Sequence, residues 1–499
     1  MSDVKTDQAF FCVIQKEGSQ LPSGIKFGSE VEKLALWADG TTEGADEAAP
    51  QTQSSEPDSE AAAPLEVLMN RVADSGHQQT EMLAILDAVR TVFPMTVIKS
   101  DIVDKFAAPY KVVSKSKDYN IFKVDGDDLS KIIHALNRVF RIQSGLDQVP
   151  AAILLSIVST FDSQMSDVVR VMLGIKSDRL RSGQKKIPLS EIMAASCLED
   201  VIAEAVNDEV YQFSRGSHDE QIKYIEDNFS ISIRENWKRW PDLIEVFERR
   251  NLVAHGEAKF TSRYASICGK HAYKGSDKLV GSPVILNFKY LGQSLDILSE
   301  FAILTIFSLW RKHVKDSDSH AFSALNEVTF KLIDGERYYV AIRVTEYALN
   351  LKNTVVKEAT RLRLVVNLAS AQLHAKLKEA AYKTLDKEDW SASSDDFKIC
   401  VAALREDIDE VIRILPLVKA ADSIPSSGFN EWPVFDFIRN KVEFANSFRE
   451  VFGEELTSLA EESVFSAEAG SVSADIKTDD VEPSIESAAS SDIVDSTLH

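Results

Sequence analysis

Apolar residues recur every three or four positions along most of residues 65–453, which is the spacing that places them on one face of an α-helix. The pattern predicts an all-α protein. Only residues 9–18 (AFFCVIQKEG) have the alternation of a strand, and residues 94–126 are ambiguous. The predicted helices before residue 320 span residues 65–93, 127–142, 151–174, 189–213, 241–255 and 284–313.

Local start and stop signals frame one of these helices closely. Pro241 suits the first turn of the helix over residues 241–255, and Gly256 suits the position just after its end. Residues 256–283 are rich in Gly, Lys and Ser and are predicted to be a loop.

After residue 320 the helical pattern continues in shorter pieces, over residues 334–351, 355–377 and 395–418. The first piece, DGERYYVAIRVTEYALNL, spaces small residues so that a neighbouring helix can approach closely. It resembles the second helix of a tetratricopeptide unit, although the regular period of that family is missing. Residues 320–453 are therefore predicted to form a divergent tetratricopeptide-like helical module, with an irregular helical bundle as the alternative.

The formal net charge of −22 is concentrated in two segments. Residues 39–64 carry seven acids and no base, and residues 454–499 carry twelve acids against Lys477. Removing residues 1–38 (net −1) and these segments (−7 and −11) from the total leaves −3 for residues 65–453. Both acidic segments are rich in Ser, Ala, Thr and Pro and poor in aromatic residues, so they cannot bury enough apolar area to offset the entropy of ordering. We expect a disordered linker and a disordered tail.

One part of the nearly neutral body is distinctly basic. Residues 249–289 hold eight bases against Glu257 and Asp277. Such a stretch suits a polyanion, although a solvated basic face is the more common reason for a bias of this kind.

Several classes of protein are disfavoured by what the sequence lacks. No apolar run approaches the ~20 residues of a membrane span, and the N-terminus lacks the layout of a secretion signal, so a cytoplasmic protein is expected. The sequence has no phosphate-cradling glycine loop, nucleophile elbow or HExxH motif, and neither a metal nor a cofactor is predicted. The cysteines lie too far apart to suggest a disulfide framework or a zinc site: Cys12, Cys197, Cys268 and Cys400.

The stretch ERRNLVAHGE, residues 248–257, combines arginine, asparagine and histidine at the end of a predicted helix. At ~100° per residue, Asn251 and His255 share a face, whereas Arg250 and His255 are about 140° apart. Only a long, forked side chain at residue 250, or a helix that ends near residue 255, can then bring the three residues together. A guanidinium binds phosphate through two hydrogen bonds, and an imidazole transfers protons near neutral pH. Together they can cleave RNA without a metal, because attack by the 2′-hydroxyl needs only a base, an acid and charge stabilisation.

The spacing Arg250-Asn251-x-x-x-His255 resembles the Arg-x4–6-His motif of the HEPN superfamily. The bare pattern is weak, since Arg71 and His77 also match it. The resemblance extends over residues 187–232 and 240–264 and over a closing helix that ends in LWRKH, and it covers roughly residues 127–315. This arrangement is similar to the bacterial HEPN branch found with defence and toxin systems.

The resemblance implies a metal-independent endoribonuclease in which two protomers pair to form one composite site. Arg250 would hold the scissile phosphate, His255 would act as acid or base, and Asn251 would orient the histidine or the substrate. The sequence departs from the family after the motif, where His-Gly-Glu-Ala replaces the common His-Asn-x-Gly. Further basic residues are predicted to contact RNA: Arg249, Lys259, Arg263 and Lys270.

A second histidine close to acids lies in RGSHDE, residues 215–220. It lacks the spacing of metal ligands, and the stretch is interpreted as a polar turn between helices.

The resemblance therefore implies an antiphage-defence or toxin effector that is a homodimer and cleaves RNA. A regulatory protein is a further candidate partner, and no membrane is involved. The alternative is a non-catalytic HEPN and helical-repeat adaptor that binds protein or nucleotide. The expected segments are 1–38 with one strand, the linker 39–64, a helical region of unknown role 65–126, the HEPN-like domain 127–315, the repeat-like module 320–453 and the tail 454–499.

Overall fold

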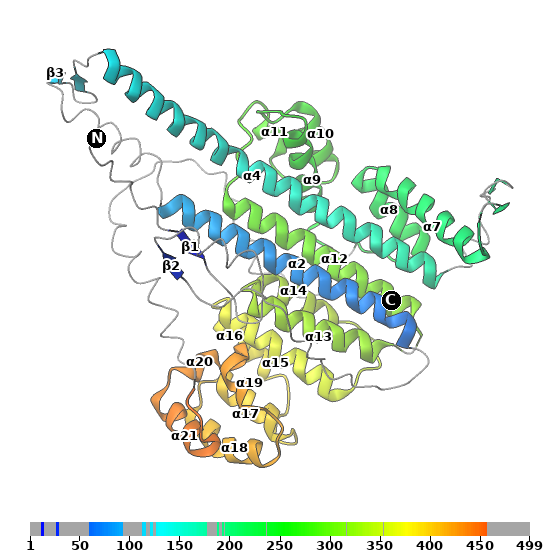
Figure 1. Ribbon diagram of the computed structural model, residues 1–499. Helices are drawn as coiled ribbons and strands as arrows, with labels where there is room; N and C mark the ends of the chain where they lie inside the picture. Colours follow the sequence, from blue (N-terminus) through cyan, green and yellow to red (C-terminus); the bar gives the residue numbers. More distant parts are fainter. Residues whose placement is uncertain are drawn as a thin grey trace. The chain divides into compact units, whose positions relative to one another are not determined.

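The chain divides into two compact units, Met1–Pro57 and Asp58–His499. Most of the predicted linker and nearly all of the predicted tail lie outside the described residues. In the computed structural model (Figure 1), the described residues are 11–13, 26–28, 59–92, 112–115, 120–122, 126–176, 187–188, 192–193, 195–235, 237–315, 317–352 and 354–456.

The first unit contains a short antiparallel hairpin. Strand β1 (Phe11–Val13) lies inside the predicted strand over residues 9–18 and pairs with β2 (Lys26–Gly28). The β2 strand was not predicted.

The second unit is built from helices, which confirms the all-α prediction. Within its described residues, the only strands are β3 (Val112–Lys115) and β4 (Asn120–Phe122), which form a second antiparallel hairpin in the ambiguous stretch. The helices up to residue 313 are α2 (Ser59–Val92), α4 (Gly126–Ile175), α7 (Leu198–Arg215), α8 (His218–Phe229), α9 (Trp240–Ala254), α10 (Ser262–Lys270), α11 (Ser276–Leu279) and α12 (Phe288–His313). The later ones are α13 (Asp318–Asp334), α14 (Tyr338–Leu349), α15 (Glu358–His374), α16 (Lys378–Leu385), α17 (Asp395–Leu404), α18 (Ile408–Ala420), α19 (Ser426–Glu431), η1 (Pro433–Phe435), α20 (Asp436–Arg439) and α21 (Val442–Phe452).

Three long helices, α2, α4 and α12, lie side by side and carry the centre of the hydrophobic core (Figure 1). Helix α12 is buried on almost every side, and its Phe301, Phe307 and Trp310 are fully enclosed. Helix α4 contributes apolar residues at helical spacing, among them Phe161 and Met165. These helices form the support on which the shorter α8 and α9 pack.

The sequence predicted two helices, residues 127–142 and 151–174, where the structure has the single helix α4. Gly145 and Pro150, which lie between the two predicted helices, are both inside this helix. A proline removes one backbone hydrogen bond, at a cost of ~3 kcal/mol, and leaves the residues after it free to stay helical. The predicted break was therefore wrong.

Two predicted boundaries also shift. Helix α2 begins at Ser59, inside the stretch predicted as linker. Helix α7 begins at Leu198 rather than near residue 189, because Cys197 before it has an extended backbone.

The predicted loop over residues 256–283 contains two short helices, α10 and α11. Phe260, Tyr264 and Cys268, spaced four residues apart, form a small core with Leu252 of α9. The loop prediction was wrong because it weighed the glycines and lysines and missed this apolar face.

Three pairs of helices after residue 318 are joined by turns of the same geometry. The pairs are α13 with α14, α15 with α16, and α17 with α18. Each turn has a residue with positive φ, namely Glu336 (57°), Lys376 (63°) and Glu406 (56°). In each, the next residue's N–H donates to a carbonyl five positions back, as Arg337 does to Leu332 (2.8 Å). The predicted single helix over residues 395–418 is therefore two helices, α17 and α18.

The hydrophobic core does not follow the predicted domain boundaries at residues 126 and 315–320. Helix α2, from the region of unknown role, packs on α12, and α13 packs on α2. Helix α15 then joins two clusters, because Leu364 belongs to the core of the long helices whereas Val366 belongs to the core of the C-terminal helices.

Two segments, Ser144–Ile175 and Phe288–His313, are long and apolar enough to cross a membrane. The second is α12, most of which is enclosed by other helices. Core helices of folded proteins meet the same criteria, so the predicted lack of a membrane span stays a prediction.

Gly76 of α2 faces a buried arginine of a neighbouring segment. A side-chain carbon at this position would overlap Nη1 of Arg337, a residue only 4% exposed. The Arg337 guanidinium donates from Nε to Asp296 Oδ1 (3.0 Å) and from Nη2 to the Leu295 carbonyl (3.3 Å). The missing side chain at residue 76 thus leaves room for the buried Arg337 guanidinium, whose ion pair with the partly exposed Asp296 ties the start of α14 to α12.

We expect Gly76→Ala to lower the free energy of unfolding by about 1–3 kcal/mol, because the methyl group displaces the buried guanidinium. Gly174→Ala is the matched control, since Gly174 is also helical and a Cβ there meets nothing within 4 Å. That change should be neutral or stabilising by up to about 1 kcal/mol. Urea unfolding of both variants checks the prediction, and equal effects would contradict it.

Candidate functional site

Helix α9 presents the predicted site residues, and its ends are set by local signals. Pro241 occupies the first turn, as predicted. At the other end Gly256 has φ of 70°, its N–H donates to Val253 (3.0 Å), and the Glu257 N–H donates to Leu252 (2.9 Å). This turn confirms that the helix stops at Gly256, and it leaves His255 exposed at the end of α9.

The start of α9 is held by a buried carboxylate on α12. Glu300, 2% exposed, accepts from Trp237 Nε1 (2.7 Å) and Arg239 Nη1 (2.6 Å) just before α9. It also accepts from Arg343 Nε on α14 (2.5 Å). These bonds fix where α9 begins relative to the core.

The structure brings two of the three predicted catalytic residues into contact. Arg250 Nη1 donates to Asn251 Oδ1 (3.2 Å), and Arg250 Nη2 donates to Asp162 Oδ2 on α4 (3.3 Å). The Nε atom of Arg250 is buried and has no hydrogen-bond partner among the described residues. The guanidinium is thus held on one edge and keeps unused donors.

His255 stands apart from this pair. Its backbone N–H donates to the Asn251 carbonyl (3.1 Å), but within the described residues its side chain makes no hydrogen bond or ion pair. Arg250 does not reach round to His255, because the angular offset on the helix points the arginine at α4.

His218, which was interpreted as part of a polar turn, contacts the same α4 aspartate as Arg250. His218 Nε2 lies 2.9 Å from Asp162 Oδ1, and its ring stacks on Phe247 with 3.7 Å between centroids and 3° between planes. His218 is the first residue of α8, because Ser217 and Glu220 form a capping box there. The polar-turn interpretation was wrong for His218, whose side chain is only 14% exposed.

Glu248 extends the polar cluster on α9. Asn251 Nδ2 donates to Glu248 Oε1 (3.3 Å), so the Asn251 amide links Glu248 to Arg250. Burial raises the pKa of Glu248, against the opposing effects of the Asn251 hydrogen bond and the Arg263 charge. The result is a continuous chain of polar contacts from Glu248 through Asn251, Arg250 and Asp162 to His218.

Sequence reasoning missed Asp162 and His218 because they lie 88 and 32 positions before Arg250. One usable signal was a lone carboxylate directly after Phe161 in an apolar helical run. Its partners could not be identified without the packing of α4 against α8 and α9.

Arg249, which is predicted to contact RNA, has a side chain that is only 11% exposed. It pairs with Glu245, which is 3% exposed, through Nε (2.7 Å), and its guanidinium lies 3.9 Å from the Tyr290 ring centroid. Glu245 also accepts from the hydroxyls of Tyr264 (2.7 Å) and Tyr290 (2.9 Å). Burial and the Glu245 charge raise the pKa of both tyrosines. Arg249 therefore neutralises a buried carboxylate.

The other predicted RNA contacts are exposed. Lys259 precedes α10, and Arg263 and Lys270 lie seven residues apart on it, which places them on one helical face. None of the three makes an ion pair with a described residue. They are available for an anionic partner.

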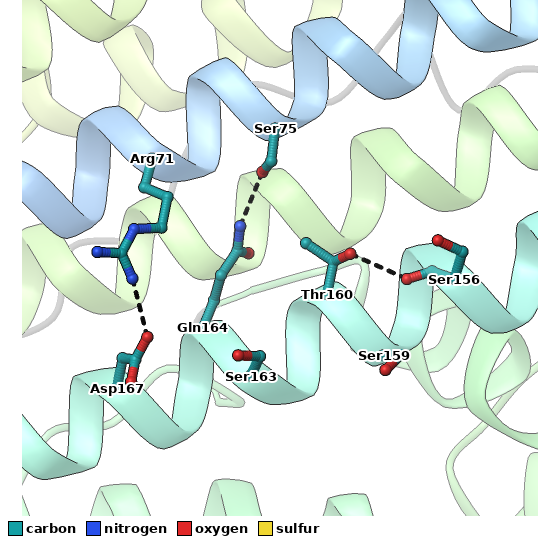
Figure 2. A pocket seen from close by; sticks show the side chains of 8 residues that line it. All are labelled: Arg71, Ser75, Ser156, Ser159, Thr160, Ser163, Gln164 and Asp167. Carbon is teal, nitrogen blue, oxygen red and sulfur yellow. Dashed lines mark hydrogen bonds and ion pairs between the residues drawn. The ribbon is translucent and has the colours of Figure 1, made fainter.

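The two residues of the second Arg–His match, Arg71 and His77, have separate partners. Arg71 Nη1 binds Asp167 Oδ2 (2.9 Å) beside a polar hollow of about 370 Å³ between α2 and α4 (Figure 2). His77 instead faces Gly335 and pairs with Glu81 (3.2 Å). The two residues of this match therefore contact different helices.

In the part of the chain that the structure describes, no group of three His, Cys, Asp or Glu side chains is placed to hold a metal ion. A scan against models of protein families gave no match, and searches of curated proteins and of solved structures gave none either.

We expect Arg249→Ala to lower the free energy of unfolding by about 3–5 kcal/mol, because it leaves Glu245 charged and unpaired in the core. Lys259→Ala, which removes an exposed cation, should change it by less than about 0.5 kcal/mol. Chemical denaturation of both variants is the measurement. A small effect for Arg249 would show that its pairing contributes little to the fold.

Glu248→Gln should stabilise the protein at pH 7 but not at pH 4. The folded state raises the Glu248 pKa above its ordinary value of 4.5, so the ionised form disfavours folding. The penalty is absent below the unfolded pKa and grows as the pH rises through the folded pKa. Glutamine removes it and still accepts the hydrogen bond from Asn251. Urea unfolding at both pH values tests this, and an equal effect at the two pH values would contradict it.

Proposed function

We propose that the protein is a metal-independent endoribonuclease of the HEPN type. The observation that carries the proposal is the end of α9, where Arg250 and Asn251 touch and His255 is exposed one turn further on. Arginine, amide and imidazole are the groups that this reaction needs, and the histidine is free to meet a substrate or a second protomer.

In the proposed reaction, the ribose 2′-oxygen attacks the adjacent phosphorus and the bond to the 5′-oxygen breaks. A base takes the 2′-hydroxyl proton and an acid gives a proton to the departing 5′-oxygen, which leaves a cyclic phosphate and a 5′-hydroxyl. Arg250 stabilises the charge on the phosphate oxygens. His255 serves as acid or base, and Asn251 orients Arg250 through their hydrogen bond.

Exposed cations beside α9 support an RNA substrate. Lys259, Arg263 and Lys270 would contact its phosphates along α10. Since cleavage needs both an acid and a base, we propose a homodimer in which a second copy brings its own His255 to the same cleft.

The cellular role proposed with this activity is that of a cytoplasmic antiphage-defence or toxin effector. The helix pairs after residue 318, which share one turn geometry, would form the tetratricopeptide-like surface for a regulatory protein.

One observation favours the second candidate function, a non-catalytic adaptor. The Arg250 guanidinium already has a carboxylate partner, Asp162, and an amide partner, Asn251. An arginine with these two partners can stabilise the fold without contacting RNA.

Purified protein should cleave mixed RNA in the presence of EDTA. Arg250→Ala and His255→Ala should each reduce the rate at least about 100-fold, because each removes charge stabilisation or proton transfer. Gel analysis of the RNA products and their end groups provides the measurement.

Arg71→Ala is the matched control, since it removes the arginine of the other Arg–His match and should leave the rate unchanged. If the wild-type protein leaves RNA intact, or if the two site variants cleave as fast as it does, the ribonuclease proposal fails and the adaptor is favoured.

A further inference from the structure

Three helices meet at one carboxylate next to the proposed site. Asp162 lies on α4, and its two oxygens have different partners: Oδ1 contacts His218 Nε2 of α8 (2.9 Å), and Oδ2 accepts from Arg250 Nη2 of α9 (3.3 Å). A rotation of the carboxylate that weakens one contact therefore disturbs the other. His218 thus sets the plane in which Asp162 meets the arginine.

His218 is itself fixed by packing. Its ring lies flat on Phe247, with 3° between the ring planes, and Phe247 is only 1% exposed. Phe247 also contacts Phe161, the residue before Asp162, with ring centroids 5.6 Å apart. The imidazole cannot turn without opening the aromatic core that joins α4 and α9.

The other side-chain contact of the Arg250 guanidinium comes from α9 itself. Asn251 Oδ1 accepts from Arg250 Nη1, and Asn251 Nδ2 donates to Glu248. The Arg250 guanidinium is therefore held at both Nη atoms, and its side chain stays 26% exposed. A guanidinium has five N–H donors. Two are used in these contacts and the one on Nε is buried, so two donors on the Nη atoms remain for the oxygens of a phosphate.

We propose that Asp162 and His218 are positioning residues that set the orientation of Arg250 for a phosphate group of RNA. This inference rests on the proposed ribonuclease function. His218 acts through Asp162 and does not touch the substrate, because its ring face is covered by Phe247 and only 14% of its side chain is exposed.

The contact between Asp162 and Arg250 has a measurable consequence for catalysis. An arginine that stabilises the transition state must lie within a fraction of an ångström of its best position, so loss of its support reduces kcat more than it changes KM. We expect Asp162→Ala to lower kcat about 10- to 100-fold and to change KM by less than about 3-fold.

The chain offers a matched control on the same helix. Asp167 of α4 pairs with Arg71 (2.9 Å), beside the polar hollow of Figure 2, and also with Arg170 (2.8 Å). Asp167→Ala therefore removes an aspartate–arginine pair of the same kind without touching Arg250. It should leave kcat and KM unchanged.

Phenylglyoxal labelling of arginines, followed by peptide mass spectrometry, reports the pairing directly and needs no RNA. Asp162→Ala should speed the labelling of Arg250 and leave Arg71 unchanged, whereas Asp167→Ala should do the reverse. His218→Ala should act like Asp162→Ala. His218→Gln keeps an N–H donor for Asp162, and it should restore both the slow labelling and most of kcat.

The outcomes separate the two proposals. An Arg250 labelling rate that is the same in wild type, Asp162→Ala and His218→Ala overturns the positioning role, as does an equal loss of kcat in His218→Gln and His218→Ala. A wild-type protein that does not cleave RNA overturns the ribonuclease proposal, and the labelling rates still decide whether Asp162 and His218 hold Arg250. Far-ultraviolet circular dichroism and urea unfolding identify any variant that is not folded, and the Gln variant then carries the test.

Discussion

The candidate site depends on one aromatic contact, the packing of Phe247 between Phe161 and His218. This contact joins α4, α8 and α9, and it fixes the rotation of α9 about its own axis. With Phe247 directed into the core, Arg250 three residues later faces α4 and meets Asp162. The polar cluster is thus a consequence of burying one phenylalanine, since a helix that buries one face must present a defined neighbouring face.

Buried carboxylates hold α9 along its length and separate the roles of two adjacent arginines. Glu300 fixes the residues before the helix. Glu245 within the helix accepts hydrogen bonds from Arg249 and from two tyrosine hydroxyls. A buried carboxylate needs a cation and hydrogen-bond donors. Arg249 therefore pairs with a core carboxylate, and Arg250, one residue later, points to the partly exposed polar cluster.

The site is also connected to distant parts of the chain through packed helices. Helix α4, which carries Asp162, packs on α2 and α12, and α12 contacts α14, whose Arg343 reaches Glu300. Helix α15 extends this packing to the C-terminal helix pairs. A partner that binds those pairs would thus contact helices that α15 links to the core around α9, a physical route for the proposed regulation.

Local sequence signals determined the all-α class and the ends of α9, because periodicity, Pro241 and Gly256 act within a few residues. They did not determine the continuity of α4 through Pro150, the small helices α10 and α11, or the core that crosses residues 315–320. They also could not assign Arg249 to the interior or bring His218 and Asp162 to Arg250. Only tertiary packing decided these points. Each depends on contacts between residues tens of positions apart, which form when apolar faces are buried and which no local pattern predicts.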